Sequence, residues 1–321
     1  MSAPRVTVTG ATGLIGPALV AALLDRGAQV TALTRDPPRA RAKLGDVEAV
    51  RWEPLSEPAP VEALAGRDAV VHLAGEPVAQ RWSEKARRAI RDSRVTGTRN
   101  VIAGLARAEP RPRALISSSA IGYYGAHGEE PLDEEAPAGR DFLAQVCAAW
   151  EAEALKAAEL GMRVVPVRTG VVLDARGGAL AKMLPPFRLG LGGPVAGGRQ
   201  YISWIHAEDL VGLMLAALED DRWSGPINAT APEPVSNRDF SRALGAALGR
   251  PSLLPVPGLA LRLLYGEMAE IVTTGARAVP AKPLVLGYRF RHPQLREALA
   301  AALRPAPPRA GAARTDGCRS R

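Results

Sequence analysis

Three glycines spaced three residues apart, Gly10, Gly13 and Gly16, follow a short apolar segment at the start of the chain. Glycine at the first position allows a tight turn, at the second it lets the backbone approach a pyrophosphate, and at the third it permits close packing of a helix on a strand. The helix that follows directs free N–H groups and positive potential at an anion. In this context the pattern predicts a dinucleotide site, and a glycine-rich turn without a ligand is the alternative. The residues expected at the pyrophosphate are Gly10, Thr12, Gly13, Leu14, Ile15 and Gly16.

The second expected strand ends in Thr34 and Arg35, and this strand end indicates which dinucleotide would bind. Proteins that bind NAD usually place a carboxylate there, which accepts a hydrogen bond from the ribose 2′-hydroxyl. In this chain the first carboxylate, Asp36, comes only after the arginine. A guanidinium suits a 2′-phosphate because it forms paired, charge-assisted hydrogen bonds. We therefore expect NADP(H) as the cofactor, with a solvated surface arginine as the other interpretation of Arg35.

The elements that would position these residues alternate between strand and helix patterns. Apolar segments typical of buried strands alternate with longer segments in which apolar residues recur at helical spacing. Strands are expected over residues 5–9, 29–34, 68–73, 113–117 and 164–168, and helices over 17–26, 82–107 and 141–160. Repeated units of this kind predict an α/β fold with a doubly wound parallel sheet of the Rossmann type.

The second half of the chain has a different composition and predicts a different organisation. We expect residues 1–174 to form the core of an NADP-binding domain and residues 175–303 to combine returns to the sheet with a smaller C-terminal substrate lobe. A C-terminal domain is expected at about 250–303. Seven glycines within residues 177–198 predict a loop-rich insertion, and two interpretations of 190–198 are open: a mobile lid and an ordinary surface loop. The basic tail 304–321 is expected to be disordered.

Composition and charge exclude several classes of protein. The net charge is +8, but residues 304–321 hold five Arg and one Asp, so half of the excess lies in the tail. Nucleic-acid-binding proteins usually carry a basic stripe with interleaved aromatic residues. Aromatic residues make up only 4% of this chain and form no such stripe, which argues against a nucleic-acid partner. Two cysteines exclude a disulfide scaffold. His72, His127, His206 and His292 show no metal-ligand spacing and two cysteines cannot complete a structural site, so we expect no bound metal. No apolar run is long enough for a membrane helix and no signal peptide precedes the first strand, so we expect a cytoplasmic protein without a membrane partner. The oligomeric state stays open.

Further segments carry a resemblance to a known family. His72-Leu-Ala-Gly75, Ser117-Ser-Ser119-Ala-Ile-Gly-Tyr-Tyr-Gly125 and Ser203-Trp-Ile-His206-Ala-Glu-Asp209-Leu, together with the glycine turn, resemble the extended short-chain dehydrogenases/reductases, the group that contains nucleotide-sugar epimerases. Phe187-Arg-Leu-Gly-Leu-Gly-Gly-Pro194 and Trp150-Glu151 are similar to an atypical subgroup, the "epimerase family proteins", which carry a C-terminal domain of unknown function. The resemblance covers residues 5–303.

This resemblance implies a Rossmann-type domain, bound NADP(H), and a substrate cleft between that domain and the C-terminal lobe. It implies that Leu73, Ala74 and Gly75 form the loop that passes the adenine ribose. It also implies that Arg94 lies on a helix that faces the cofactor, and that the main chain at Val171 approaches the nicotinamide amide. The resemblance does not imply a particular reaction or substrate.

The family's usual acid–base pair is absent from this sequence. Members that oxidise or reduce an alcohol use a tyrosine four residues before a lysine, because hydride transfer needs a matched acid or base at the substrate oxygen. Tyr123, Tyr124, Tyr201, Tyr265 and Tyr288 are followed four residues later by His127, Gly128, Ile205, Ala269 and His292. In the helix where the pair would lie, Leu143 aligns with the tyrosine and Cys147 with the lysine.

Three interpretations of this absence remain open. The chain could be an NADP-dependent oxidoreductase or epimerase with a relocated acid, and Tyr123 or Tyr124 is then the candidate. It could be a non-catalytic NADP(H)-binding sensor, or an enzyme fold retained as a scaffold. Ser119 could polarise a substrate carbonyl or only satisfy the backbone at a strand end. The hypothesis we carry forward is reduction or epimerisation of a small carbonyl or sugar-like substrate.

Overall fold

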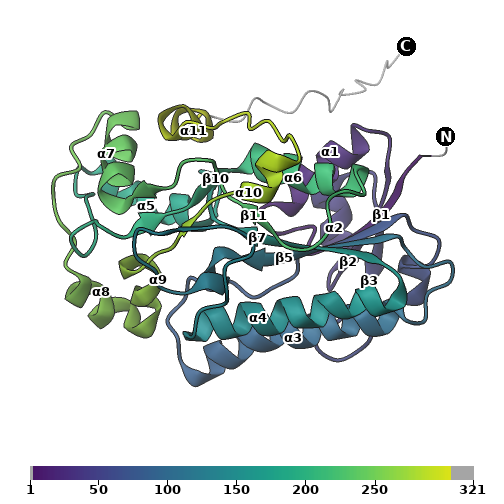
Figure 1. Ribbon diagram of the computed structural model, residues 1–321. Helices are drawn as coiled ribbons and strands as arrows, with labels where there is room; N and C mark the ends of the chain where they lie inside the picture. Colours follow the sequence, from purple (N-terminus) through teal and green to yellow (C-terminus); the bar gives the residue numbers. More distant parts are fainter. Residues whose placement is uncertain (1–2, 305–321) are drawn as a thin grey trace, which may run out of the picture.

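A seven-stranded parallel sheet forms the centre of the computed structural model, which describes residues 3–304 (Figure 1). The strand order is β11-β7-β5-β4-β1-β2-β3. The strands are β1 Arg5–Thr9, β2 Gln29–Thr34, β3 Glu48–Arg51, β4 Ala69–His72, β5 Ala114–Ala120, β7 Arg163–Thr169 and β11 Ile227–Ala229. The expected doubly wound Rossmann-type fold is confirmed.

Helices cover both faces of the sheet, which explains why its strands are buried almost throughout. One face packs against α1 Gly16–Leu24, α2 Pro37–Leu44 and α6 Ala207–Glu219. The other face packs against α3 Glu84–Leu105 and α4 Phe142–Leu155, which lie side by side along it (Figure 1). Ser83 and Asp141 accept hydrogen bonds from the first turns of α3 and α4 and fix where these helices begin.

The strand order reverses direction between β1 and β4. The chain passes from β1 outward to β2 and β3, then returns to the other side of β1 and continues through β4, β5 and β7. In open α/β sheets ligands bind at such a switch point, outside the carboxyl ends of the strands. The glycine turn follows β1 directly, so it lies at this edge.

The second half of the chain adds a C-terminal lobe, and Trp204 and Phe240 lie in a core that α5 Gly178–Arg188, α7 Asn237–Ala247 and α11 Leu295–Ala302 share. Its other helices are α8 Gly258–Tyr265, α9 Glu270–Thr273 and α10 Ala281–Val285. The strand pairs are β8 Val171–Leu173 with β10 Trp204–His206, β9 Tyr201–Ile202 with β12 Val235–Ser236, and β6 Pro131–Leu132 with β13 Arg277–Ala278. Short 3₁₀ helices are η1 Val61–Ala63, η2 Ile121–Tyr124, η3 Lys156–Leu160 and η4 Gly266–Ala269.

The prediction of a loop-rich insertion over 177–198 is wrong for its first half, which forms helix α5. Leu180, Leu184 and Phe187 recur at helical spacing and are buried in the lobe core, which stabilises the helix despite its two internal prolines. The second half is an extended connection. There the N–H of Val195 donates to Oδ1 of Asn237, and Val195 forms a β-bridge with Val256.

The remaining long-range organisation has fewer sequence signals. Strand β11 comes from the second half of the chain and pairs with β7, while β3 pairs with β2. The domain boundaries proposed from sequence stay predictions, and residues 305–321 of the tail lie outside the described residues.

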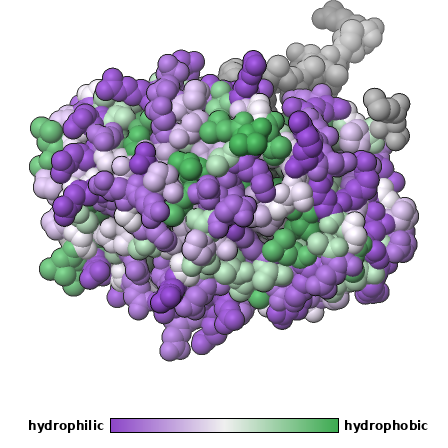
Figure 2. Space-filling view, viewed as in Figure 1, coloured by the Kyte–Doolittle hydropathy of each residue, from purple (hydrophilic) through white to green (hydrophobic). Residues whose placement is uncertain are grey.

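Among residues 3–304, no helix has both the length and the apolar character needed to span a membrane. The visible face is mostly hydrophilic, with apolar side chains in separate patches (Figure 2).

Candidate nucleotide-binding and catalytic site

The glycine turn has the close contacts that explain its glycines. Gly10 has a φ of +65°, and a Cβ there would lie 2.7 Å from the backbone of Leu73 and Ala74. A Cβ on Gly16 would lie 2.3 Å from the carbonyl oxygen of Ala11. Gly13 is exposed and donates its N–H to the carbonyl oxygen of Gly10. The turn therefore brings β1, helix α1 and the loop after β4 close together.

The N-terminus of α1 is free to bind an anion. Ile15 precedes the helix and provides no side-chain cap. Within the described part of the chain, the N–H groups of Leu14, Ile15 and Gly16 donate to no other atom. Unpaired donors at a helix N-terminus together with the helix dipole form a site for phosphate oxygens. The chemistry of these donors fits the predicted pyrophosphate.

At the end of β2 the arginine is exposed, whereas the carboxylate of the next residue is already hydrogen-bonded. Arg35 is exposed directly after the strand. Asp36 is occupied as the cap of α2, because its Oδ1 accepts the N–H of Arg39 at 3.1 Å. From the same helix, Nζ of Lys43 donates to the carbonyl oxygen of Thr12 at 2.7 Å. Lys43 was not predicted from sequence, and it adds a second cation beside the turn.

A buried histidine fixes the loop after β4. Nδ1 of His72 lies 2.6 Å from Oγ1 of Thr9, and Nε2 lies 3.0 Å from Oγ1 of Thr98. Thr9 Oγ1 also accepts the N–H groups of Leu73 and Ala74. Burial lowers the pKa of His72 to about 4, so the ring is neutral at pH 7. The network joins β1, β4 and α3 and holds the loop of residues 73–75 at the switch point.

Arg94 extends from α3 to the same loop. Its NH1 donates to the carbonyl oxygens of Glu76 and Ile90, and its guanidinium lies 5.1 Å from the ring centre of Trp150. A Cβ on Gly75 would lie 3.4 Å from its guanidinium carbon. Arg94 therefore lies against the loop after β4, and its facing a cofactor stays a prediction.

Ser119 belongs to a buried ionic network that joins β5, α4 and β7. Its hydroxyl donates to Oε1 of Glu151 at 2.5 Å. Arg168 binds both carboxylate oxygens of Glu151 at 2.9 Å, and the side chains of this pair are 4% and 6% exposed. Burial opposes the charge of Arg168, but the hydrogen bonds and charge of Glu151 outweigh it and raise the pKa of Arg168.

The two candidate tyrosines have different environments in η2. Tyr124 is fully buried, and its hydroxyl donates to Oδ1 of Asn228 at 2.6 Å and accepts from Arg168 at 3.0 Å. Burial raises the pKa of Tyr124 to about 12. Tyr123 is half-buried, and its ring centre lies 3.6 Å from the guanidinium carbon of Arg168. Within residues 3–304 its hydroxyl makes no hydrogen bond, which leaves Tyr123 as the phenol that can meet a ligand.

The aligned positions of the missing pair lie beside η2. A Cβ on Gly122 would contact Cβ of Leu143 at 3.5 Å and Sγ of Cys147 at 3.9 Å. Burial raises the pKa of the Cys147 thiol to about 12, so it stays protonated and behaves as a small apolar group. At this point α4 offers the site no acid, base or charge.

Val171 begins strand β8, and its N–H is already in use. It donates to the carbonyl oxygen of Ser203 at 2.8 Å. Gly170 allows this contact, because a Cβ there would lie 2.5 Å from the same oxygen. A contact of the Val171 main chain with a nicotinamide amide stays a prediction.

Polar groups at the start of α6 have structural partners. Nδ1 of His206 accepts the N–H of Glu208, and the carboxylate of Asp209 accepts the N–H groups of Arg291 and His292. His206, Glu208 and His292 bring ligand-type atoms within 4.8 Å of one another, but Arg291 lies 4.0 Å from the Glu208 carboxylate. The prediction that no metal is bound is not tested by this arrangement.

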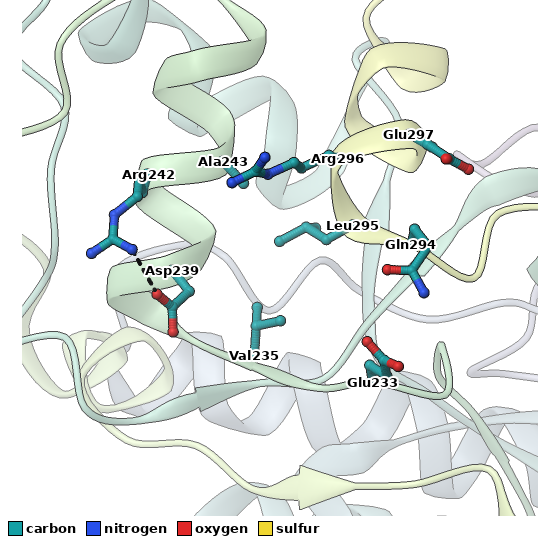
Figure 3. A pocket seen from close by; sticks show the side chains of 9 residues that line it. All are labelled: Glu233, Val235, Asp239, Arg242, Ala243, Gln294, Leu295, Arg296 and Glu297. Carbon is teal, nitrogen blue, oxygen red and sulfur yellow. Dashed lines mark hydrogen bonds and ion pairs between the residues drawn. The ribbon is translucent and has the colours of Figure 1, made fainter.

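A cavity of about 350 Å³ lies between α7 and the start of α11 (Figure 3). Asp239 and Arg242 form an ion pair on its α7 side. None of its lining residues is a residue of the predicted site. They are Glu233, Val235, Asp239, Arg242, Ala243, Gln294, Leu295, Arg296 and Glu297.

Comparison with known families assigns the chain. Residues 6–229 match the model of the NAD-dependent epimerase/dehydratase family, and residues 256–302 match a domain of unknown function, DUF1731. The chain belongs to the NAD-dependent epimerase/dehydratase family. The predicted resemblance to extended short-chain dehydrogenases/reductases of the epimerase-family subgroup is confirmed.

Named relatives match this chain over nearly its whole length. The chain is 41% identical over 298 residues to the chloroplastic epimerase family protein SDR39U1 homologue of Arabidopsis thaliana, covering 92% of this chain and 86% of that protein. It is 42% identical over 296 residues to epimerase family protein Mb2239 of Mycobacterium bovis, covering 92% and 96%. The human epimerase family protein SDR39U1, solved with NADPH, superposes with a TM-score of 0.82 at 34% identity, covering 93% and 98%.

Sequence reasoning found the glycine turn, whose contact with a cofactor stays a prediction, but missed the residues that connect Ser119 to Tyr123. Glu151 entered only as part of a family motif, and Arg168 only as the end of a strand. Charged side chains are rarely buried unless they are paired. Glu151 and Arg168 are charged residues in otherwise apolar segments, and this was the signal from which their pairing could have been predicted. The sequence carries no signal for Lys43 reaching the glycine turn.

Proposed function

We propose that this family member binds NADP(H) and acts as an oxidoreductase or epimerase on a small carbonyl or sugar-like substrate. The observation that carries the proposal is the buried network in which Glu151 and Arg168 hold Ser119 and Tyr123 beside the carboxyl edge of the sheet. A structural scaffold would not need, next to a buried guanidinium, a phenol that has no hydrogen-bond partner among residues 3–304. Perturbed and paired ionisable groups at a ligand crevice are typical of active sites.

The cofactor would lie across the switch point. The free N–H groups at the start of α1 would bind its pyrophosphate, and Arg35 would pair with the 2′-phosphate, with Lys43 adding positive charge nearby. Support comes from the uncapped helix, from the occupied carboxylate of Asp36, and from the human relative solved with NADPH. Bound NADP(H) supplies or accepts a hydride at this site.

The chain's own residues would handle the substrate oxygen. Tyr123 offers the free hydroxyl and is the proposed proton donor or acceptor, in place of the absent tyrosine–lysine pair. Ser119 would hydrogen-bond the same substrate group. The fully buried Tyr124 keeps a structural role by fixing Arg168 and Asn228.

A non-catalytic NADP(H)-binding sensor is the second candidate. The specific observation in its favour is that Leu143 and the buried, protonated thiol of Cys147 occupy the positions aligned with the family's acid–base pair, so no acid, base or charge stands there. The two candidates share the cofactor site and differ only in turnover. A cytoplasmic location stays a prediction, since the Arabidopsis relative carries the name chloroplastic.

The test is a hydride-transfer screen with the full chain. The protein is incubated with NADPH and a panel of small aldehydes, ketones and keto-sugars, and the loss of reduced nicotinamide absorbance is followed. Turnover with at least one compound, reduced about 100-fold or more in Tyr123→Phe, supports the enzyme. Tyr201→Phe serves as a control on a half-buried tyrosine elsewhere. Tight NADPH binding without turnover on any compound supports the sensor.

A further inference from the structure

Two histidines from distant parts of the chain lie ring against ring at the start of α6. The ring centres of His206 and His292 are 3.9 Å apart, and the ring planes are tilted by 46°. Glu208 lies beside them, with its Oε2 3.2 Å from Nε2 of His292. One ligand-type atom from each of the three residues lies within 4.8 Å of the other two. Two imidazoles and a carboxylate are a ligand set that zinc takes in proteins.

The backbone brings these side chains together without help from an ion. His206 ends β10, which pairs with β8, and Glu208 lies in the first turn of α6. The buried carboxylate of Asp209 accepts the N–H groups of Arg291 at 2.7 Å and His292 at 3.0 Å. These two bonds tie the segment before α11 to the first turn of α6. Ligands on fixed backbone lose less freedom when an ion binds, which favours binding.

The shortest separation fits the size of a zinc site. Zinc binds histidine nitrogen and carboxylate oxygen at about 2.0–2.2 Å in a tetrahedron, so neighbouring ligand atoms lie roughly 3.4 Å apart. The 3.2 Å between Nε2 of His292 and Oε2 of Glu208 is close to this value. The wider separations close by side-chain rotation, for which the Glu208 side chain is free because it is 58% exposed. The same exposure allows water to be the fourth ligand.

Two existing interactions compete with an ion at this place. Nδ1 of His206 accepts the N–H of Glu208 at 3.2 Å, and NH1 of Arg291 lies 4.0 Å from Oε2 of Glu208. The Arg291 side chain is 73% exposed, so it can move into the solvent when a divalent cation replaces it. Ligation by His206 costs one long hydrogen bond at the helix start and gains a bond to the metal. The competition therefore lowers the affinity but leaves three ligands available.

We propose that His206, Glu208 and His292 bind a divalent transition-metal ion, with Zn²⁺ the best match, and that this ion links α6 to the segment before α11. His206 and Glu208 belong to the region that matches the epimerase model, and His292 to the region that matches DUF1731. The ion would stabilise the contact between these two regions. The site is independent of the proposed cofactor chemistry. The proposal departs from the expectation of no metal because spacing within a segment cannot reveal ligands that are 84 residues apart.

The first experiment measures metal binding by the full chain. The protein is freed of metal with EDTA and moved into a buffer without chelator. It is then titrated with ZnCl₂ by calorimetry and with CoCl₂ by visible absorbance, because protein-bound Co²⁺ has d–d bands and Zn²⁺ has none. We expect one tight site per chain and d–d bands that added Zn²⁺ removes. Zn²⁺ should also raise the Tm, since it binds the folded chain.

Four variants locate the ion. Glu208→Gln and His292→Gln each remove one ligand at a position that is not fully buried, and each should weaken Zn²⁺ binding at least about 100-fold. Even residues that only contact a ligand change metal affinity by about 10- to 100-fold. The rise in Tm with Zn²⁺ should be lost in both. His127→Gln, at an exposed histidine elsewhere, should change nothing. Arg291→Gln removes the competing cation and should bind Zn²⁺ at least as tightly as the wild type.

The alternative is that Glu208 and His292 form an ion pair only. No binding of Zn²⁺ by the wild-type chain, or equal affinity in the wild type, Glu208→Gln and His292→Gln, would show this and overturn the proposal. Circular dichroism without metal checks that each variant is folded, and a single folded variant is sufficient for the comparison. NADPH titration is a separate measurement, so failure of this site and failure of the cofactor site are distinguishable.

Discussion

The guanidinium carbon of Arg168, on β7, lies 3.6 Å from the ring centre of Tyr123, on η2. The same guanidinium binds Glu151 through two hydrogen bonds and the Tyr124 hydroxyl through a third. One buried cation thus contacts both tyrosines, and within residues 3–304 the Tyr124 hydroxyl is hydrogen-bonded whereas the Tyr123 hydroxyl is not. The division of roles between two adjacent tyrosines follows from this arrangement.

Replacing each tyrosine with phenylalanine should separate these roles. Tyr123→Phe removes a hydroxyl without partners in the described chain, so stability should change by less than about 0.5 kcal/mol. Tyr124→Phe leaves buried partners without their hydrogen bond and should cost about 1–3 kcal/mol. Urea unfolding of the two variants measures the difference. Equal destabilisation would contradict the assignment.

Breaking the buried ion pair should be far more costly than breaking an exposed one. Arg168→Met leaves the carboxylate of Glu151 buried without its cation, and the expected loss is about 3–5 kcal/mol. Arg99→Met removes the cation that pairs with Glu153, but Arg99 is 58% exposed and solvent screens the pair, so the loss should be far smaller. Chemical denaturation of both variants compares the two losses of unfolding free energy. Similar losses would show that the network contributes little.

Acid should destabilise the protein through His72. Its folded pKa of about 4 lies below the ordinary value of 6.5, so the unfolded chain takes up the proton first. The stabilisation is complete above pH 6.5 and is lost as the pH falls toward 4, by about 3 kcal/mol in total. His72→Gln should flatten this part of the stability curve, whereas His127→Gln, at an exposed position, should not. An unchanged slope in His72→Gln would contradict the prediction.

The two ends of helix α1 should respond differently to an added methyl group. Gly16→Ala places a Cβ 2.3 Å from the Ala11 carbonyl oxygen, so the turn must shift and NADPH affinity should fall at least about tenfold. Gly27→Ala meets open space, and its positive φ costs only about 1–2 kcal/mol of stability. Calorimetric titration with NADPH separates them. Equal affinities would show that the turn does not bind the cofactor.

The sequence predicted those features that depend on neighbours in the chain. The glycine spacing, the apolar strands and the capped helices are local patterns, and the fold built from them is confirmed. Helix α5 was missed because its prolines and flanking glycines mask the helical spacing of Leu180, Leu184 and Phe187. Strand β11 was missed because three residues carry too little periodicity.

The network at Ser119 could not be predicted for a different reason. Ser119, Glu151 and Arg168 come from three elements, and only the pairing of β5 with β7 and the packing of α4 on the sheet bring them together. The same holds for Lys43, whose contact with Thr12 depends on how α2 packs beside the turn. Residue type indicated that these charges needed partners, but not which partners.

The central claim, an NADP(H) site with Arg35 at the 2′-phosphate, is tested most directly by fluorescence titration with NADPH and NADH. Wild-type protein should bind NADPH more tightly than NADH. Arg35→Ala should weaken NADPH binding by about 10- to 100-fold while leaving the affinity for NADH unchanged. Arg26→Ala, at the far end of α1, should change neither. Failure of the wild-type protein to bind either cofactor, or an Arg35→Ala variant with unaltered preference, would contradict the account.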